Sequence, residues 1–336
     1  MKSVVIGAAV AALSSPALAD HLGPSGFGSG GGMSVFAPET LDQGHWSAGI
    51  RLTYTRPEQR SDSELEALAA SGIAAHNTDY NLNASAGIAY GVNHHLTLSA
   101  ELPYVRRDRL REAEDGEVDQ LGNISGIGDL SLLAKYRLTD SGNSGFALVA
   151  GIKVPTGSTH RHGRDGGRLE TEHQPGTGSW DPIFGASAST SMGAVQLTAS
   201  ALYQLSTEGA QRTRLGDRLQ GGIALSHRFG LTPLGQAGGH NHHHGDELDE
   251  HHADHAHSSW DVFVELAGEW EGRQRIDSQV ERASGGTWAY LAPGLRFNSA
   301  SGWSAGAAVA FPVWQDIRSS HPHNRYRLIL SVGRGF

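Results

Sequence analysis

The chain has 336 residues with 45 glycines and no cysteine, and its formal net charge is −9 at pH 7. The lack of cysteine excludes disulfides and thiolate metal sites. The acidic balance argues against nucleic acid as a partner, because phosphate binding needs a basic face. Beyond the amino terminus no run of 18 apolar residues occurs, which excludes a helical membrane protein.

The amino terminus has the layout of a secretory signal. Lys2 supplies a positive charge, residues 4–13 are apolar, and residues 17–19 read A-L-A, which fits a cleavage site. We therefore expect residues 1–19 to be removed on export to the bacterial outer membrane. Residues 20–45 follow as a glycine-rich segment, which the sequence leaves open as a lumen plug or a disordered tail.

The rest of the chain, residues 46–336, alternates apolar and polar residues with a period of two, which predicts β-strands. In residues 79–91, DYNLNASAGIAYG, every second residue is apolar or aromatic. Residues 95–105 repeat the pattern after a short connection, which predicts a hairpin. The predicted strands cover residues 46–55, 79–91, 95–105, 128–138, 145–155, 179–190, 194–206, 219–229, 260–270, 287–297, 303–314 and 326–336.

These strands predict an all-β fold, a closed antiparallel transmembrane β-barrel of about 12 strands. A tilted strand needs about 9–11 residues to cross a bilayer, and short connections alternate here with long ones, as in outer-membrane barrels. Among the long connections, 63–72 is expected to form a short helix and 107–126 to be an outer loop. A soluble sandwich has shorter strands, about 5–6 residues, and a solenoid would show a fixed repeat. A monomer is the default expectation.

The polar face of the strands carries charged residues that should line the lumen. Mixed charge of this kind either lines a narrow pore or pairs up inside a closed barrel. The predicted lumen-lining residues are Arg51, Glu101, Lys135, Arg137, Lys153, Asp261, Glu265, Glu269 and Arg327.

Residues 238–257, GGHNHHHGDELDEHHADHAH, concentrate histidine and acidic side chains. Counting strands places this segment in a periplasmic connection. Neutral imidazole binds Zn, Cu and Ni, and carboxylates can complete the shell. The irregular spacing suits a metal buffer or sensor rather than a catalytic centre, and a solvated loop without specific function is the alternative. The predicted ligands are His240, His242, His243, His244, Asp246, His251, His252, Asp254, His255 and His257.

A second, smaller candidate for metal binding lies in the predicted outer loop 156–178. It combines three histidines with three acidic residues, namely His160, His162, His173, Asp165, Glu170 and Glu172.

Several motifs resemble the MetA-like, meta-pathway phenol-degradation family of outer-membrane β-barrels. They are GIGDLSLLAKYRL (126–138), ALVAGIKVPTGS (147–158), PGTGSWDPIFGAS (175–187), YLAPGLRF (290–297) and FPVWQD (311–316). The resemblance covers about residues 46–336. It implies a transporter barrel and, by analogy, uptake of small hydrophobic or aromatic compounds. No catalytic residues carry over, and G-x-S-x-G is absent, so no enzyme is expected.

Three functions remain open from the sequence. The first is a channel for small solutes, linked to a metal through the histidine segment. The second is a non-conducting barrel that displays histidines to a periplasmic efflux component or metal chaperone. The third is an uptake channel for aromatic or hydrophobic compounds. The expected partners are outer-membrane lipid and a small solute or metal ion. No cofactor is required, although Zn, Cu or Ni could bind the histidine segment.

Overall fold

The structure is a computed structural model that describes residues 31–114, 117–230, 258–318 and 320–336. The predicted signal peptide, the first part of the glycine-rich segment and the histidine segment 238–257 lie outside the described residues.

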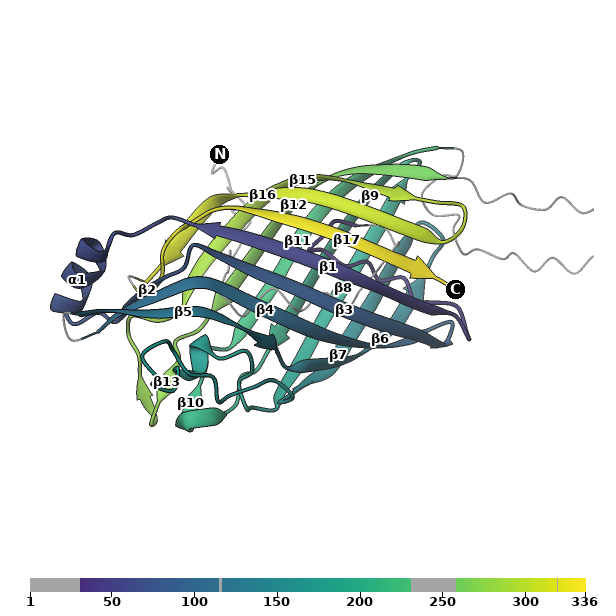
Figure 1. Ribbon diagram of the computed structural model, residues 1–336. Coiled ribbons are helices and arrows are strands. Elements are labelled where there is room, and N and C mark those ends of the chain that lie inside the picture. Colours follow the sequence, from purple (N-terminus) through teal and green to yellow (C-terminus); the bar gives the residue numbers. More distant parts are fainter. Residues whose placement is uncertain (1–30, 115–116, 231–257, 319) are drawn as a thin grey trace, which may run out of the picture.

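Twelve long antiparallel strands form a closed barrel (Figure 1). The first strand, β1, pairs with the last strand, β17, with Leu52 opposite Leu330. Strand β4 pairs with β6, so the ring of strands is closed. Every strand predicted from the period of two is present. The twelve are β1 (Trp46–Pro57), β3 (Tyr80–Asn93), β4 (Leu96–Glu114), β6 (Leu130–Asp140), β7 (Ser144–Val154), β8 (Asp181–Met192), β9 (Val195–Gln204), β11 (Arg218–Phe229), β12 (Ser259–Glu271), β15 (Gly286–Asn298), β16 (Trp303–Ile317) and β17 (Asn324–Gly335).

The two ends of the barrel differ. At one end, β3 and β4, β6 and β7, β8 and β9, and β15 and β16 are joined by short turns, and β1 begins there beside the carboxyl terminus. The opposite end carries helix α1 (Asp62–Ala70), β2 (Ala75–Asn77), β5 (Glu117–Ile127), β10 (Thr213–Arg214), β13 (Arg275–Ile276) and β14 (Gln279–Val280), as Figure 1 shows. Because outer-membrane barrels have short periplasmic turns and long outer loops, the end with α1 is the outer one.

Strand β4 extends far beyond the predicted strand 95–105. It continues to Glu114, and β5 returns along its outer half, with Arg111 opposite Gln120. The prediction of a loop over 107–126 was therefore wrong. Its charged sequence hides the strand pattern, because the hairpin leaves the lipid and packs against other outer elements instead. Leu110 and Leu121 are buried in one such cluster.

Helix α1 confirms the short helix expected over 63–72. Ser61 caps its first turn, since its hydroxyl accepts from the Glu64 amide while the Glu64 carboxylate accepts from the Ser61 amide. This reciprocal capping box satisfies amides that lack partners at a helix start. Leu65 is fully buried and packs with Ala75 and Ala113, which fixes the helix onto β2 and β4. Among the described residues, no helix has the length and apolar character needed to cross a membrane.

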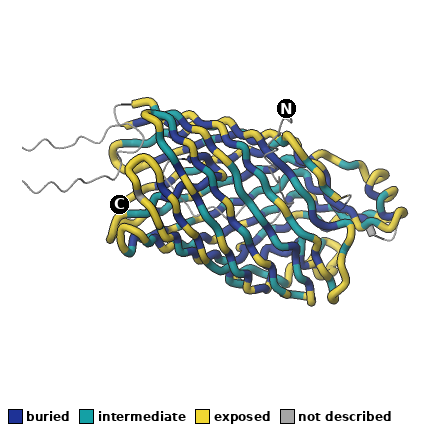
Figure 2. The backbone as a smooth tube through the Cα atoms, turned by 180° about the vertical axis from the view of Figure 1, so that it is seen from behind, coloured by how far each residue is buried: buried dark blue, intermediate teal, exposed yellow. Residues whose placement is uncertain are grey.

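The barrel wall has one apolar and one polar face, and buried and exposed residues alternate along its strands (Figure 2). Large apolar side chains such as Ile50, Leu148 and Leu330 are exposed and face outward, where lipid covers them. Their neighbours Ala147 and Val149 are buried and face inward. This alternation confirms the reasoning from the sequence, because each face meets a different solvent.

Candidate functional site

The charged residues expected to line the lumen lie on the inner face of the wall. Six of them are buried, and Arg51, Arg137 and Glu269 are half-buried. Arg327 binds Glu269 across the barrel interior, with 3.0 Å between Nη2 and Oε2. Asp261 accepts from Arg228, with 2.9 Å between Oδ2 and Nη2. Much of the interior charge is therefore paired. The six buried residues are Glu101, Lys135, Lys153, Asp261, Glu265 and Arg327.

Residues 31–41 of the glycine-rich segment run inside the barrel and are called the strap here. The fully buried carboxylate of Glu265 on β12 accepts the Met33 amide at 2.8 Å, the Ser34 amide at 3.1 Å and the Ser34 hydroxyl at 3.0 Å. A side chain at Gly32 would collide with that carboxylate, since its Cβ would lie 1.7 Å from Oε2. The glycine is needed for this close approach.

Three further contacts anchor the strap. Arg296 Nη2 donates to the Gly32 carbonyl at 2.7 Å, and Lys135 Nζ donates to the Ala37 carbonyl at 3.1 Å. Nearer the short-turn end, the Leu41 amide donates to Thr97 Oγ1 at 2.9 Å. Lys135 and Glu265, which were expected to line the lumen, are thus engaged by the strap.

Apolar side chains of the strap reach opposite parts of the wall. Phe36 packs on Leu133, Val149, Ile183 and Leu202, which come from β6, β7, β8 and β9. Met33 packs on residues of β12, β16 and β17, including Phe263 and Ile329. The sequence had suggested a uniformly polar inner face. The inner face also carries apolar residues, and these pack against the strap.

A small hollow of about 50 Å³ lies beside the strap within the barrel. Met33 and Ser34 line it from the strap. Its polar wall residues are Arg51, Thr53, Gln220, Glu269 and Arg327, and its small or apolar ones are Gly221, Ala267, Gly268 and Ile329. The lining therefore places polar and apolar side chains around one narrow space in the lumen.

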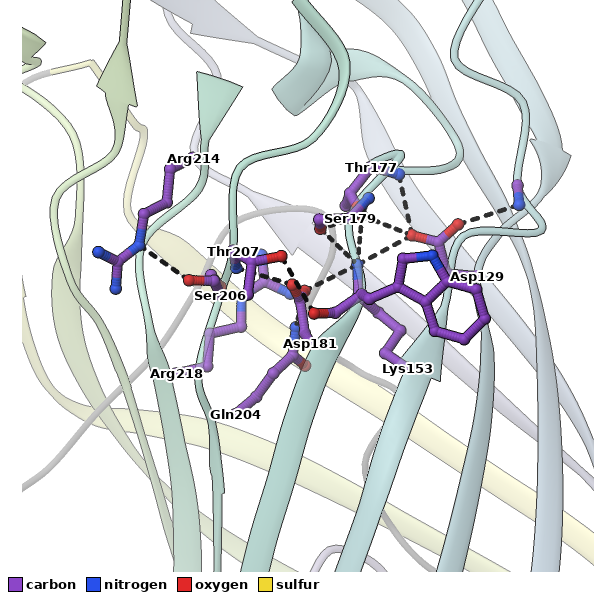
Figure 3. Close-up of polar contacts among 12 residues, drawn as sticks. Asp129, Lys153, Thr177, Ser179, Asp181, Gln204, Ser206, Thr207, Arg214 and Arg218 are labelled. Atoms are coloured by element: carbon purple, nitrogen blue, oxygen red, sulfur yellow. Dashed lines mark hydrogen bonds and ion pairs between the residues drawn. The ribbon is translucent and has the colours of Figure 1, made fainter. Parts of the chain in front are cut away.

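Residues from three of the family-like motifs meet in one buried polar network toward the outer end (Figure 3). Lys153 Nζ lies 2.9 Å from Asp129 Oδ2 and 2.9 Å from Asp181 Oδ2, and it also binds Thr177. Asp129 accepts the Gly157 and Thr177 amides, each at 2.9 Å. One cation thus ties two carboxylates together, and the network holds residues 155–180 against the wall.

Glycines permit the backbone contacts around this network. A Cβ on Gly176 would lie 2.4 Å from the carbonyl carbon of Gly157, and one on Gly157 would lie 2.8 Å from that of Gly128. Three segments therefore meet backbone to backbone. This explains physically why the stretches GIGD, PTG and PGTG contain glycine where they do.

Reasoning from the sequence missed Asp129 and Arg296. Arg296 sits at an inward position of a predicted strand, so the alternation could have identified it. Asp129 lies in the predicted strand 128–138, an even number of residues before Lys135, so the alternation could have identified it as well. For the strap, the inward direction of Glu265 and Lys135 was predicted, but their partners were not, because the strap carries no periodic signal.

The proposed metal ligands of segment 238–257 lie outside the described residues. Its flanking residues Gly230 and Ser258 do lie at the short-turn end, where Phe229 pairs with Trp260. Of the second candidate group, His160 and His162 are exposed, whereas His173 is buried. The structure therefore separates residues that the sequence had grouped.

The fold and the sequence both relate the chain to outer-membrane proteins. An outer membrane channel from Pseudomonas putida F1 is 16% identical, covering 89% of this chain and 97% of its own, with a TM-score of 0.56. The β domain of the Bordetella autotransporter BrkA is 10% identical with a TM-score of 0.46, covering 88% and 100% of the two chains. A monoaromatic hydrocarbon channel, a TodX mutant, is 10% identical with a TM-score of 0.43, covering 93% and 98%. No curated protein matches the sequence.

The expected outer-membrane β-barrel is confirmed by the fold and by the family match. The family model described as "Putative MetA-pathway of phenol degradation" matches residues 59–274. That range includes the GIGD, PTG and PGTG stretches whose residues meet around Lys153. The chain therefore belongs to this family of the phenol-degradation MetA pathway.

Proposed function

We propose that the protein is an outer-membrane channel for small aromatic compounds such as phenols, in which the strap narrows the lumen. The observation that carries this proposal is the narrow hollow beside the strap in a closed barrel, lined by both polar and apolar side chains. Met33, Ala267 and Ile329 offer an apolar surface for a ring, while Thr53 and Gln220 offer partners for a hydroxyl group.

Two relations support this reading. The family description refers to phenol degradation, and the similar structure from Pseudomonas putida F1 is described as an outer membrane channel. A cell that degrades phenols needs them to cross the lipopolysaccharide layer. A barrel with an interior that accepts one polar and one apolar group meets that need, whereas a wide water-filled pore would not discriminate.

Uptake of radiolabelled phenol by porin-deficient cells that produce the protein tests the proposal. Ala267→Trp fills the hollow and should reduce uptake to that of cells without the protein. Val264→Trp places the same ring on the exposed outer face of the same strand and should leave uptake unchanged. Equal uptake with both variants would show that the hollow is not part of the transport path. No uptake and no ion conductance with the unaltered protein would favour the non-conducting barrel.

The link to a metal through segment 238–257 stays a prediction from the sequence. The segment would bind Zn²⁺ or Cu²⁺ weakly at overlapping sites on the periplasmic side, where an efflux component or metal chaperone could exchange the ion. Zn²⁺ titrated from that side in a planar bilayer should change the conductance of the full chain. The change should be absent when 238–257 is deleted, and its persistence there would contradict the prediction.

A further inference from the structure

The outer end of the barrel contains a buried cluster of histidines and glutamates that the channel function does not use. His76 lies in β2, Glu112 in the outer part of β4, and Glu172 and His173 in the short helix η1 (Thr171–His173). His321 lies before β17. All three imidazoles are buried. Four separate stretches of the chain therefore bring ligand-type side chains to one place.

The ligand atoms of His76, Glu172 and His173 lie close enough together to share one ion, and Glu112 lies beside His173. Glu172 Oε1 lies 3.6 Å from His76 Nδ1 and 3.6 Å from His173 Nε2. His173 Nε2 lies 3.3 Å from Glu112 Oε1. Zn²⁺ binds nitrogen and oxygen at about 2.0–2.2 Å, so neighbouring ligand atoms of a tetrahedron lie roughly 3.4 Å apart. The three candidate ligands His76, Glu172 and His173 all have donor atoms within 4.8 Å of one another.

The second nitrogen of His76 also has a partner. His76 Nε2 lies 2.9 Å from His321 Nδ1, so His321 fixes the ring with Nδ1 directed at Glu172. Histidine ligands of metals are commonly held in this way through the nitrogen that does not bind the ion. Arg107 and Arg60 support the same arrangement, since they donate to the backbone carbonyls of His173 and His321 at 2.7 and 2.6 Å.

The donor chemistry suits a borderline divalent cation. Two carboxylates supply negative charge, and a mixed imidazole and carboxylate shell selects borderline ions such as Zn²⁺ over Mg²⁺ or Ca²⁺.

We propose that His76, Glu112, Glu172 and His173 form a site for one Zn²⁺-type divalent ion, with His321 as the positioning residue behind His76. The ion joins the first outer loop to the β4–β5 hairpin and to the loop that precedes β8. This site is independent of segment 238–257 and of the proposed transport, because it lies in the outer loops.

Zinc content of the purified full-length protein tests the site. The eight histidines of 238–257 are first replaced by glutamine, which leaves chain length unchanged and removes competing ligands. This background chain should retain one Zn²⁺ after dialysis. His173→Gln should abolish retention, and His162→Gln, an exposed histidine of the same loop, should not. His321→Gln should weaken Zn²⁺ binding by about 10–100-fold, as expected for a residue behind a ligand.

Two further readouts make the result decisive. X-ray absorption at the zinc edge should show nitrogen and oxygen neighbours at about 2.0–2.2 Å. If His173→Gln does not fold, the isosteric Glu172→Gln replaces it and should lose zinc in the same way. A folded background chain that retains no zinc would overturn the proposal. So would equal retention by the ligand variants, or a shell of six oxygens.

Discussion

Substituting Glu265 by glutamine should release the strap from the barrel wall. The fully buried carboxylate accepts two amides and one hydroxyl from Met33 and Ser34. Glutamine keeps the shape of the side chain but has one acceptor oxygen instead of two. Its NH₂ group cannot accept a hydrogen bond, so some donors of the strap lose their partner. A hydrogen bond to a charged group contributes about 1.5–3 kcal/mol. Loss of two such bonds, offset by those that glutamine retains, should weaken docking of the strap by about 3 kcal/mol.

That energy corresponds to a population change of roughly a hundredfold, since about 1.4 kcal/mol is a factor of ten. The change can be measured by thiol labelling, because the chain has no cysteine of its own. Val35→Cys places a thiol on the strap, where the side chain is buried, so labelling reports how often the strap undocks. Adding Glu265→Gln should accelerate labelling by about two orders of magnitude while the barrel stays folded.

The matched control is Asp261→Asn on the same face of the same strand. Its carboxylate binds Arg228 and Asn298. It should leave the labelling rate of Val35→Cys within a few-fold of the parent. Equal labelling of the Glu265→Gln variant and the parent would refute the reasoning, because Glu265 would then not hold the strap. Fast labelling in the parent would refute it as well, since the strap would already be undocked.

Three other predictions concern the wall and its outer network. Lys153→Met leaves two buried aspartates without their cation and should cost about 3–5 kcal/mol in urea unfolding from detergent; an unchanged midpoint would mean that the network adds no stability. Gly176→Ala forces a Cβ against Gly157 and should cost about 1–3 kcal/mol, and wild-type stability would show that the loop yields. Leu330→Arg on the outer face should cost about 2–4 kcal/mol, but Met192→Arg at the short-turn end about 0–1. Equal costs would contradict the placement of the membrane.

The twelve strands could be predicted from sequence because lipid and lumen impose opposite demands on alternate residues. The signal fails where that contrast ends. Arg111 and Glu112 continue β4 beyond the lipid, and their side chains bind outer-loop partners, so alternation no longer marks the strand.

The sequence predicted which charged side chains point into the barrel, but it did not predict which groups they bind. Lys135 and Glu265 were expected to point inward, and they do, but each binds the strap through contacts between residues 98 and 231–232 positions apart. Likewise, His173 and Glu172 were noted together in the sequence, whereas His76 and His321 stand alone in it. Only the closed barrel brings those four side chains to one place.

The position of the strap also sets an order for assembly. The strap comes before β1 in the chain, yet it docks on Ser200 of β9, Glu265 of β12 and Arg296 of β15. Its binding surface does not exist until strands from the far end of the sequence are in place. Contacts so distant in sequence form slowly, since the chain must close long loops first. The first segment of the described chain is therefore the last to find its place, and a barrel caught before that step would have an unobstructed interior.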